Sequence, residues 1–191
     1  MPEDTSSQDA SAELTSLFSS SGEWQRLPDD FLEKLANYLE RSKSSGTLKT
    51  GDIDFLVKKA DQLRHLSYAE FSKLCDIIEI VTPGNQQLEK LKFHKLFNAG
   101  KHERAADLIV QGKLTDIDKD TISAVMELDV PESILGKLLL ILARKGVFPE
   151  SILWEFFKSG EAHPERINIL GEMNKSGDKD LALHLALESL K

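Results

Sequence analysis

The stretch VPESILGKLLLILARKGVFPESILWEFF, residues 130–157, contains the pentapeptide PESIL twice. Gly146 and Pro149 interrupt the apolar pattern between the two copies, so each copy predicts the start of a separate helix. Proline suits a first helical position because it has no amide proton to leave unpaired, and the glutamate after it faces the positive end of the helix dipole. We therefore expect an αα-hairpin. Its apolar faces contain Leu138, Leu139 and Leu142 in the first helix and Phe156 and Phe157 in the second.

The same helical spacing extends over most of the chain. From residue 28 onward, apolar residues recur three and four positions apart, and no stretch alternates apolar and polar residues as a half-buried strand would. We expect an all-α fold of about ten helices, stacked as antiparallel hairpins in an irregular α-solenoid or a helical bundle. The expected helices begin near residues 28, 51 and 67 and then cover 86–98, 102–111, 116–128, 131–145, 149–159, 164–175 and 179–190.

Three glycines mark turns between consecutive helices in the second half of the chain. Gly100, Gly146 and Gly177 each follow one apolar helical pattern and precede another, which is typical of a helix end. Around the first of them, KLFNAGKHERAADLI at 95–109 resembles the turn region of tetratricopeptide and pentatricopeptide repeats. The resemblance covers residues 90–190 without the tryptophan and tyrosine landmarks of tetratricopeptide units. It implies helix hairpins that act as binding surfaces.

Composition divides the chain into a tail and a body. Residues 1–22 are rich in serine and acidic side chains, and we expect them to form a disordered acidic tail. Residues 23–191 are expected to form a helical domain, with a subdivision near 82–86 as an alternative. The net charge of −8 falls mostly on the first 30 residues, so the body is near neutral and neither favours nor excludes binding to a phosphate backbone.

The expected location of the protein is intracellular, either cytoplasmic or nuclear. The single cysteine, Cys75, cannot form a disulfide within the chain, and the first residues lack the apolar core of a secretory signal. The longest apolar run, LLLILA at 138–143, is far shorter than the roughly 20 residues that cross a bilayer. We therefore expect no membrane association.

The tail contains one short apolar cluster that could bind a partner. Leu14, Leu17 and Phe18 have the spacing i, i+3, i+4, so they would form one side of a helical turn. A turn this short does not persist alone in water, but it could fold against a groove on a partner or on the body of this protein. The alternative is a solubilising tail with three incidental apolar residues.

A basic segment follows the third expected helix and could hold phosphate or an acidic partner. It comprises Lys90, Lys92, His94, Lys95, Lys101 and Arg104. A run of this kind is more often a solvated helix face, since exposed aromatic residues within the cluster are needed to indicate nucleic acid.

The segment DIDKDTISAVME, residues 116–127, resembles an EF-hand calcium loop in the spacing of its acids. The candidate ligands are Asp116, Asp118, Asp120 and Glu127. Thr121 stands where the loop needs a glycine and Ser123 where it needs an apolar anchor, so the pattern also fits an acidic first turn of a helix. We expect no metal or other cofactor.

No nucleophile elbow, phosphate-binding loop, dinucleotide fingerprint or zinc motif occurs in the sequence, and no small-molecule substrate is indicated. The favoured interpretation is a non-enzymatic interaction module, an α-helical adaptor or assembly subunit that binds a peptide or a helical partner protein. An RNA-binding helical-repeat protein, using the basic segment, is the alternative. A degenerate calcium-binding protein is a more distant one.

Overall fold

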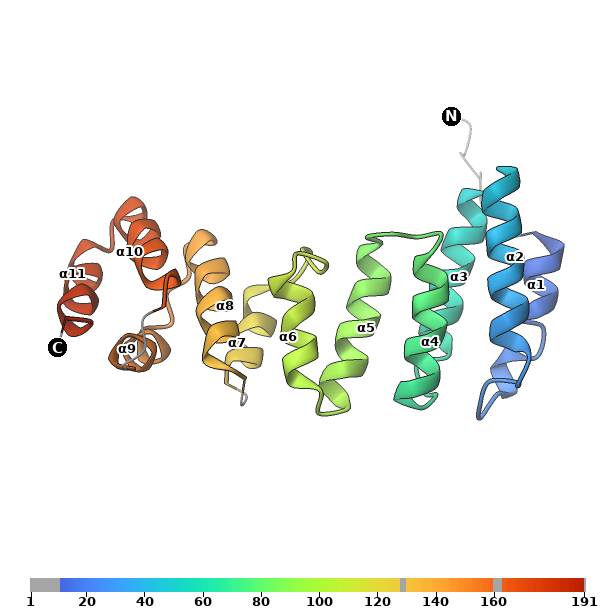
Figure 1. Ribbon diagram of the computed structural model, residues 1–191, viewed down its shortest axis with the longest axis horizontal. Coiled ribbons are helices and arrows are strands. Elements are labelled where there is room, and N and C mark those ends of the chain that lie inside the picture. Colours follow the sequence, from blue (N-terminus) through green and yellow to red (C-terminus); the bar gives the residue numbers. More distant parts are fainter. Residues whose placement is uncertain (1–10, 128–129, 160–162, 191) are drawn as a thin grey trace, which may run out of the picture. The chain divides into compact units, whose positions relative to one another are not determined.

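The computed structural model of the protein describes residues 11–127, 130–159 and 163–190. Within these ranges the chain forms eleven α-helices and one 3₁₀ helix, without strands, and neighbouring helices pack against one another (Figure 1). The prediction of an all-α fold is confirmed. Contacts divide the chain between Ala99 and Gly100 into two compact units, which we call unit 1 and unit 2. The segment 82–86, where a subdivision was an alternative, joins two helices that contact each other within unit 1.

Unit 1 is built from the first five α-helices. Its elements are α1 (Ala12–Leu17), the 3₁₀ helix η1 (Ser21–Glu23), α2 (Phe31–Ser45), α3 (Thr50–Gln62), α4 (Tyr68–Glu79) and α5 (Gln86–Asn98). Helix α2 contacts α1 and α4, and α3, α4 and α5 contact one another. The core between them is apolar, and its fully buried side chains include Leu35, Leu39, Leu56, Phe71 and Leu74.

Helix α1 lies in the segment for which the sequence predicts disorder, and this expectation does not hold for residues 11–22. Ser11 caps α1, its hydroxyl accepting from the amide of Leu14, and the same hydroxyl lies 2.5 Å from the hydroxyl of Tyr38 in α2. Leu14 and Phe18 are buried in the unit 1 core, with 0% and 2% of their surface exposed. Contacts with the body offset the entropy of ordering a helix that is too short to persist alone. The rest of the expected tail, residues 1–10, lies outside the described residues.

Helix α4 begins with a side-chain cap at Ser67. The hydroxyl of Ser67 accepts a hydrogen bond from the amide of Glu70, 3.3 Å away. The carboxylate of Glu70 accepts from that hydroxyl and from the amide of Leu27, 2.9 Å away. These hydrogen bonds, with Ser67 contributing most, lower the pKa of Glu70. Ser67 therefore caps α4, while Glu70 holds the Ser67 hydroxyl and also fixes the loop that precedes α2.

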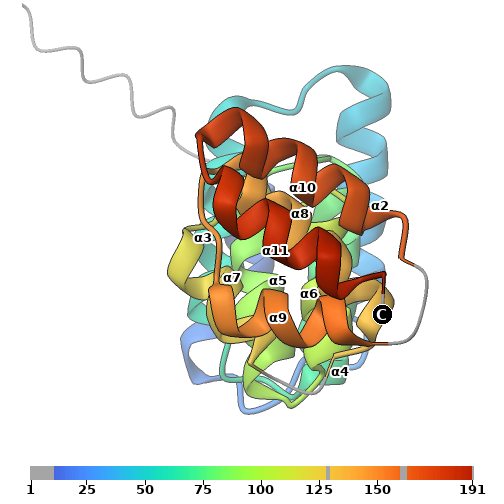
Figure 2. The ribbon, with the colours of Figure 1, turned by 90° about the vertical axis from the view of Figure 1, so that its left-hand side faces the viewer.

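Unit 2 contains the remaining six helices. They are α6 (His102–Val110), α7 (Lys119–Met126), α8 (Glu132–Arg144), α9 (Glu150–Lys158), α10 (Glu165–Ser176) and α11 (Lys179–Glu188). Helix α8 is central, because it contacts α6, α7, α9 and α10, while α11 contacts α9 and α10. Figure 2 shows α10 and α11 side by side, next to α8 and α9. Successive helices of the unit therefore pack on helices that precede them in the chain.

The two PESIL copies begin α8 and α9, as predicted, and these helices contact each other. Pro131 and Pro149 occupy the N-cap positions, so each helix starts at the glutamate that follows. Gly146 between them has a φ of 72°, in the left-handed region that favours glycine. The expected turns at Gly100 and Gly177 likewise have positive φ values and lie between helices. The helix, glycine turn, helix pattern is thus confirmed at all three places.

Arg166 in α10 fixes the C-terminal end of α9. Its guanidinium donates hydrogen bonds to the carbonyl oxygens of Phe156 and Ser159 and to the Ser159 hydroxyl, 2.6 Å away. The same group lies 5.3 Å and 5.6 Å from the ring centroids of Phe156 and Phe157. The carbonyls that α9 leaves unpaired at its end therefore receive donors from the next helix.

Candidate binding surfaces

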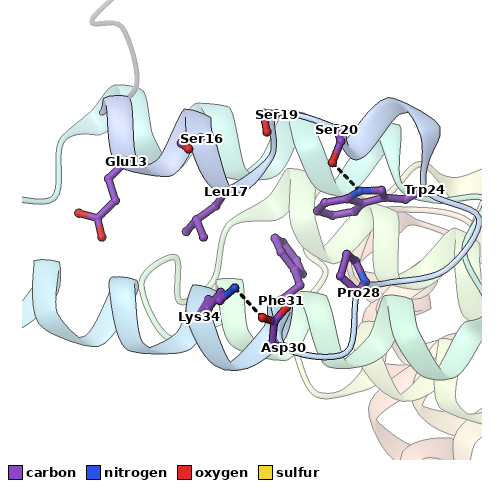
Figure 3. A pocket seen from close by; sticks show the side chains of 10 residues that line it. All are labelled: Glu13, Ser16, Leu17, Ser19, Ser20, Trp24, Pro28, Asp30, Phe31 and Lys34. Atoms are coloured by element: carbon purple, nitrogen blue, oxygen red, sulfur yellow. Dashed lines mark hydrogen bonds and ion pairs between the residues drawn. The ribbon is translucent and has the colours of Figure 1, made fainter.

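A cleft of about 480 Å³ lies between α1 and the start of α2 (Figure 3). Figure 3 shows Leu17 of α1 and Phe31 of α2 inside it, with Trp24 and Pro28 at one end. Its remaining lining residues are Glu13, Ser16, Ser19, Ser20, Asp30 and Lys34. The base of the cleft is therefore apolar and aromatic, whereas its edges are polar.

The charged groups at the edge of this cleft already have partners. The carboxylate of Glu13 pairs with Arg41, and that of Asp30 lies 2.5 Å from the ammonium of Lys34. The Lys34 contact lowers the pKa of Asp30. The indole nitrogen of Trp24 donates to the hydroxyl of Ser20, 3.0 Å away. The charged groups at the edge of the cleft are therefore engaged within unit 1.

The three apolar residues of the predicted binding cluster differ in their burial. Leu14 and Phe18 are in the core of unit 1, and Leu17 is half-buried in the cleft. The cluster therefore docks on its own body, which was one of the three possibilities that the sequence left open.

The predicted basic segment is divided between the two units. Lys90, Lys92, His94 and Lys95 belong to α5 in unit 1, whereas Lys101 and Arg104 belong to unit 2. A smaller cleft of about 290 Å³ surrounds residues 100–104 of unit 2, and it includes the acidic Glu103 beside the bases. Each unit therefore contains its own part of the basic residues.

Lys92 is enclosed by acidic side chains. Its side chain is only 13% exposed, and its ammonium pairs with the carboxylate of Glu79 in α4 and lies 3.6 Å from that of Glu89. Burial by itself would lower the pKa of Lys92, but the hydrogen bond to Glu79 and the two negative charges outweigh it, so the pKa is raised. Lys92 joins α4 to α5 and is not placed to bind an external anion.

Lys95 is also bound to the protein. Its ammonium donates to the carbonyl of Arg64, 2.9 Å away, and to that of Leu66, and it lies 5.8 Å from the ring centroid of Phe71. These carbonyls belong to the turn that follows α3, where the helix dipole is negative. Lys95 thus stabilises the junction of α3 and α4 and retains one N–H for another acceptor.

A cavity of about 560 Å³ lies next to this turn and was not expected from the sequence. It is lined by Arg64, His65, Leu91, His94, Lys95 and Asn98, and we call it the basic pocket. Arg64 and His65 are about 30 positions earlier in the chain than the basic residues of α5, so proximity in the sequence did not group them with these residues. The pair RH directly after an apolar helix was the only signal for them.

The predicted calcium segment contains a helix cap. Asp118 caps α7, and its carboxylate accepts from the amide of Thr121, 2.8 Å away, and from the hydroxyl of the same residue. These bonds, the amide first, lower the pKa of Asp118. In the described part of the chain, no three acidic, histidine or cysteine side chains gather as metal ligands would. Asp118 therefore acts as the N-cap of α7, and Asp120 lies in the first turn of this helix. This arrangement corresponds to the alternative interpretation, an acidic helix start.

The thiol of Cys75 is a candidate nucleophile by its chemistry but not by its position. The residue is fully buried in α4, and this burial raises the pKa of the thiol to about 12. It therefore stays protonated at neutral pH, whereas the thiolate is the reactive form.

An exposed apolar row lies on the last helix. Among the described residues, the large hydrophobic side chains with the highest exposure are on or next to α10 and α11: Ile167 (78%), Leu183 (59%), Leu187 (52%) and Leu190 (82%). Leu183 and Leu187 lie one turn apart on one face of α11, and Leu190 lies in the turn just after the helix ends at Glu188. We call them the α11 stripe. The sequence predicts only a helix for this segment, because apolar spacing does not distinguish an exposed face from a buried one.

Comparison with family models, curated proteins and solved structures gives no match for the chain. The helical-repeat resemblance is therefore supported only at the level of helices that pack against their neighbours. Over the residues that the structure describes, no helix combines the length and the apolar character of a membrane span.

Proposed function

We propose that the protein is a non-enzymatic interaction module, an adaptor or assembly subunit, that binds an amphipathic helix of a partner protein on the α11 stripe. The observation that carries this proposal is the exposure of Leu183 and Leu187 on one face of α11 and of Leu190 directly after the helix. Single exposed hydrophobic residues are common, but a contiguous row marks an interaction surface.

The packing within unit 2 supports a helix as the occupant. Helix α8 has two apolar rows, and it packs against earlier and later helices of the unit. The rows of α8 are Ile134, Leu138 and Leu142, and Gly136, Leu139 and Ala143, all of which are buried. Helix α11 also has two rows, since Ala182 and Leu185 are buried on α9 and α10 while the stripe is on another side. Helix α11 therefore has apolar residues on two faces, as a helix has that packs against other helices on both faces.

The expected recognition mode is a helix on a helix. A partner helix with apolar residues at i, i+3 and i+4 would insert them between the leucines of the stripe. Complete burial of one leucine contributes about 1.5–3 kcal/mol, so three leucines supply enough energy to offset part of the cost of association. Lys179 and Asp180 precede Leu183 by four and three positions on the same helix, so polar residues of both charge signs lie next to the stripe.

Site-specific photo-crosslinking tests the proposal. A photoreactive amino acid at position 187 is expected to link the full chain to a partner peptide with helical apolar spacing. The same group at Asn174, an exposed position on α10, serves as the control for random proximity. In the position-187 chain, Leu183→Ser should abolish the crosslink while leaving the melting temperature unchanged, because Leu183 is 59% exposed.

Three results would contradict the proposal. The first is the absence of any crosslink at position 187, and the second is a crosslink that Leu183→Ser leaves intact. The third is a crosslink to another copy of this chain, with a dimer in sedimentation experiments that Leu183→Ser converts to monomer, since it would make the stripe a self-association surface.

A further inference from the structure

We infer that the basic pocket of unit 1 binds a phosphate monoester carried by a partner segment. Each of its polar lining residues carries an N–H donor, and none of the described residues that line the cavity has a carboxylate. This inference concerns α3 and α5, so it does not rest on the α11 stripe.

Arg64 is the main anion-binding group of the pocket. Its side chain is 74% exposed, and its guanidinium lies 3.7 Å from the carboxylate of Asp61, a long distance for an ion pair. A guanidinium can donate two parallel hydrogen bonds to a phosphate, which a single carboxylate at this distance does not occupy. The exposed side chains of His94 and Asn98, one turn apart on α5, add further donors.

Contacts of Lys95 and His65 hold the pocket in shape, and they do not use the side chains of Arg64, His94 and Asn98. Lys95 binds the carbonyl of Arg64 and so fixes the backbone of the arginine against α5. The ring nitrogens of His65 lie 3.1 Å from the carbonyl of Gln62 and 2.7 Å from that of Trp24. The turn after α3 is therefore attached on two sides, which lowers the entropy that a ligand must overcome.

The size and charge of the pocket favour a single phosphate group over a nucleic acid strand. Helices α3 and α5 both end here, and their negative C-terminal dipoles offset part of the charge of Lys95 and Arg64. A long polyanion needs an extended basic track, whereas these donors surround one cavity and the chain has a net charge of −8.

A partner segment fits the remaining space better than a bare ion does. The cavity of about 560 Å³ is larger than a phosphate group, and Leu91 supplies an apolar surface beside the donors. A residue next to the phosphorylated side chain can pack on Leu91, so we expect a phosphopeptide to bind more tightly than inorganic phosphate.

Titration of the ¹⁵N-labelled full chain, followed by NMR, tests this inference. The probes are a short phosphoserine peptide, its unphosphorylated form, inorganic phosphate and a single-stranded RNA. The phosphoserine peptide should give saturable shifts at residues 64, 94 and 98. Arg64→Gln should weaken its binding about tenfold, as loss of a charge-assisted bidentate contact does.

Two further variants distinguish specific binding by Arg64 from general electrostatic attraction. Asp61→Asn should strengthen binding several-fold, because it removes the acid that competes for Arg64. Lys58→Gln, at an exposed position of α3, removes the same charge as Arg64→Gln and should leave the affinity within about twofold, since screening weakens distant charges.

Each outcome decides the inference. Equal binding of inorganic phosphate and the phosphopeptide would support the anion site but assign it to the free ion. Absence of saturable shifts at millimolar phosphopeptide and low salt would overturn it, and so would equal weakening by Lys58→Gln and Arg64→Gln. RNA binding without phosphopeptide binding would also overturn it, in favour of an extended surface.

Discussion

The backbone amide of Ser11 donates a hydrogen bond to the carboxylate of Asp52, 2.7 Å away, although 41 positions separate the two residues. The second oxygen of the same carboxylate accepts from the amide of Lys49, 2.9 Å away, at the start of α3. Asp52 is completely buried, and both contacts satisfy amides at helix starts. One carboxylate thus joins the entry of α1 to the entry of α3.

Asp52→Asn is expected to destabilise unit 1, although the side chain of asparagine has nearly the same size and shape as that of aspartate. The amide group of asparagine has only one acceptor oxygen, so either Ser11 or Lys49 loses its acceptor and faces an NH₂ group. A buried donor left without a partner costs about 1–3 kcal/mol. Denaturant unfolding of the full chain measures this loss, and Asp54→Asn, at an exposed position of α3, is the matched control. Equal stability of the two variants would mean that the hydrogen bonds of Asp52 do not stabilise the contact between α1 and α3.

Leu14→Ala is expected to reduce the stability of unit 1 by about 2–5 kcal/mol, because it removes a fully buried side chain from the core. Ser16→Ala on the exposed side of the same short helix should change the stability little. Thermal melting monitored by circular dichroism distinguishes the two variants. A melting temperature that Leu14→Ala does not change would mean that α1 does not dock on the body in solution.

Gly136→Ala is expected to destabilise unit 2. A Cβ atom at this position in α8 would lie 2.8 Å from Cζ of Phe156. The ring is buried between Phe157 and Arg166 and cannot move aside freely. Overpacking of this kind costs about 1–3 kcal/mol, which exceeds the gain of about 1 kcal/mol from replacing a helical glycine by alanine.

Gly171→Ala in α10 is the control for this experiment. No atom lies within 4 Å of a Cβ placed there, so only the gain in helix propensity applies. The two variants should therefore shift the unfolding midpoint in opposite directions. A stabilising Gly136→Ala would show that α8 and α9 can separate without cost.

Lys92→Met is expected to cost about 3–5 kcal/mol, because it leaves the buried carboxylate of Glu89 without its cation. Since folding raises the pKa of Lys92, its contribution to stability is complete below the ordinary lysine pKa of about 10.4. The contribution disappears as the pH rises through the higher folded-state pKa. The free energies of unfolding of the wild type and Lys92→Met should therefore converge above that pH.

The control for this experiment is Lys73→Met, at an exposed position of α4. It should cost little at any pH, because surface charges contribute little to stability. A difference between wild type and Lys92→Met that stays constant up to the highest measurable pH would contradict the assigned ion pair.

The helices from α2 onward could be predicted from the sequence because each has its own apolar spacing and its own stop signal. Gly146 and Pro149 separate α8 from α9 by local geometry alone, and so the prediction there needed no information on packing. Helix α1 lacks such independence. Its order depends on Asp52 and Tyr38, which are distant in the chain, so a local pattern could only predict disorder.

The roles of the basic residues could not be predicted from the sequence for the same reason. Lys92 and Lys95 look alike in the sequence, and both look like solvent-exposed cations. Their roles depend on Glu79 and on the carbonyls after α3, which the fold brings to α5. Composition predicts how many charges a segment carries, but only tertiary structure determines which of them an external ligand can reach.

The division between Ala99 and Gly100 has a consequence for cooperativity. Each unit contains one of the two tryptophans, Trp24 in unit 1 and Trp154 in unit 2. Trp154→Phe leaves Trp24 as the only tryptophan, so its fluorescence reports the melting of unit 1. Trp24→Phe leaves Trp154, which reports the melting of unit 2. If the two curves differ in midpoint, the molecule populates half-unfolded species, and one half of the chain can lose its structure, and its ligands, while the other remains native.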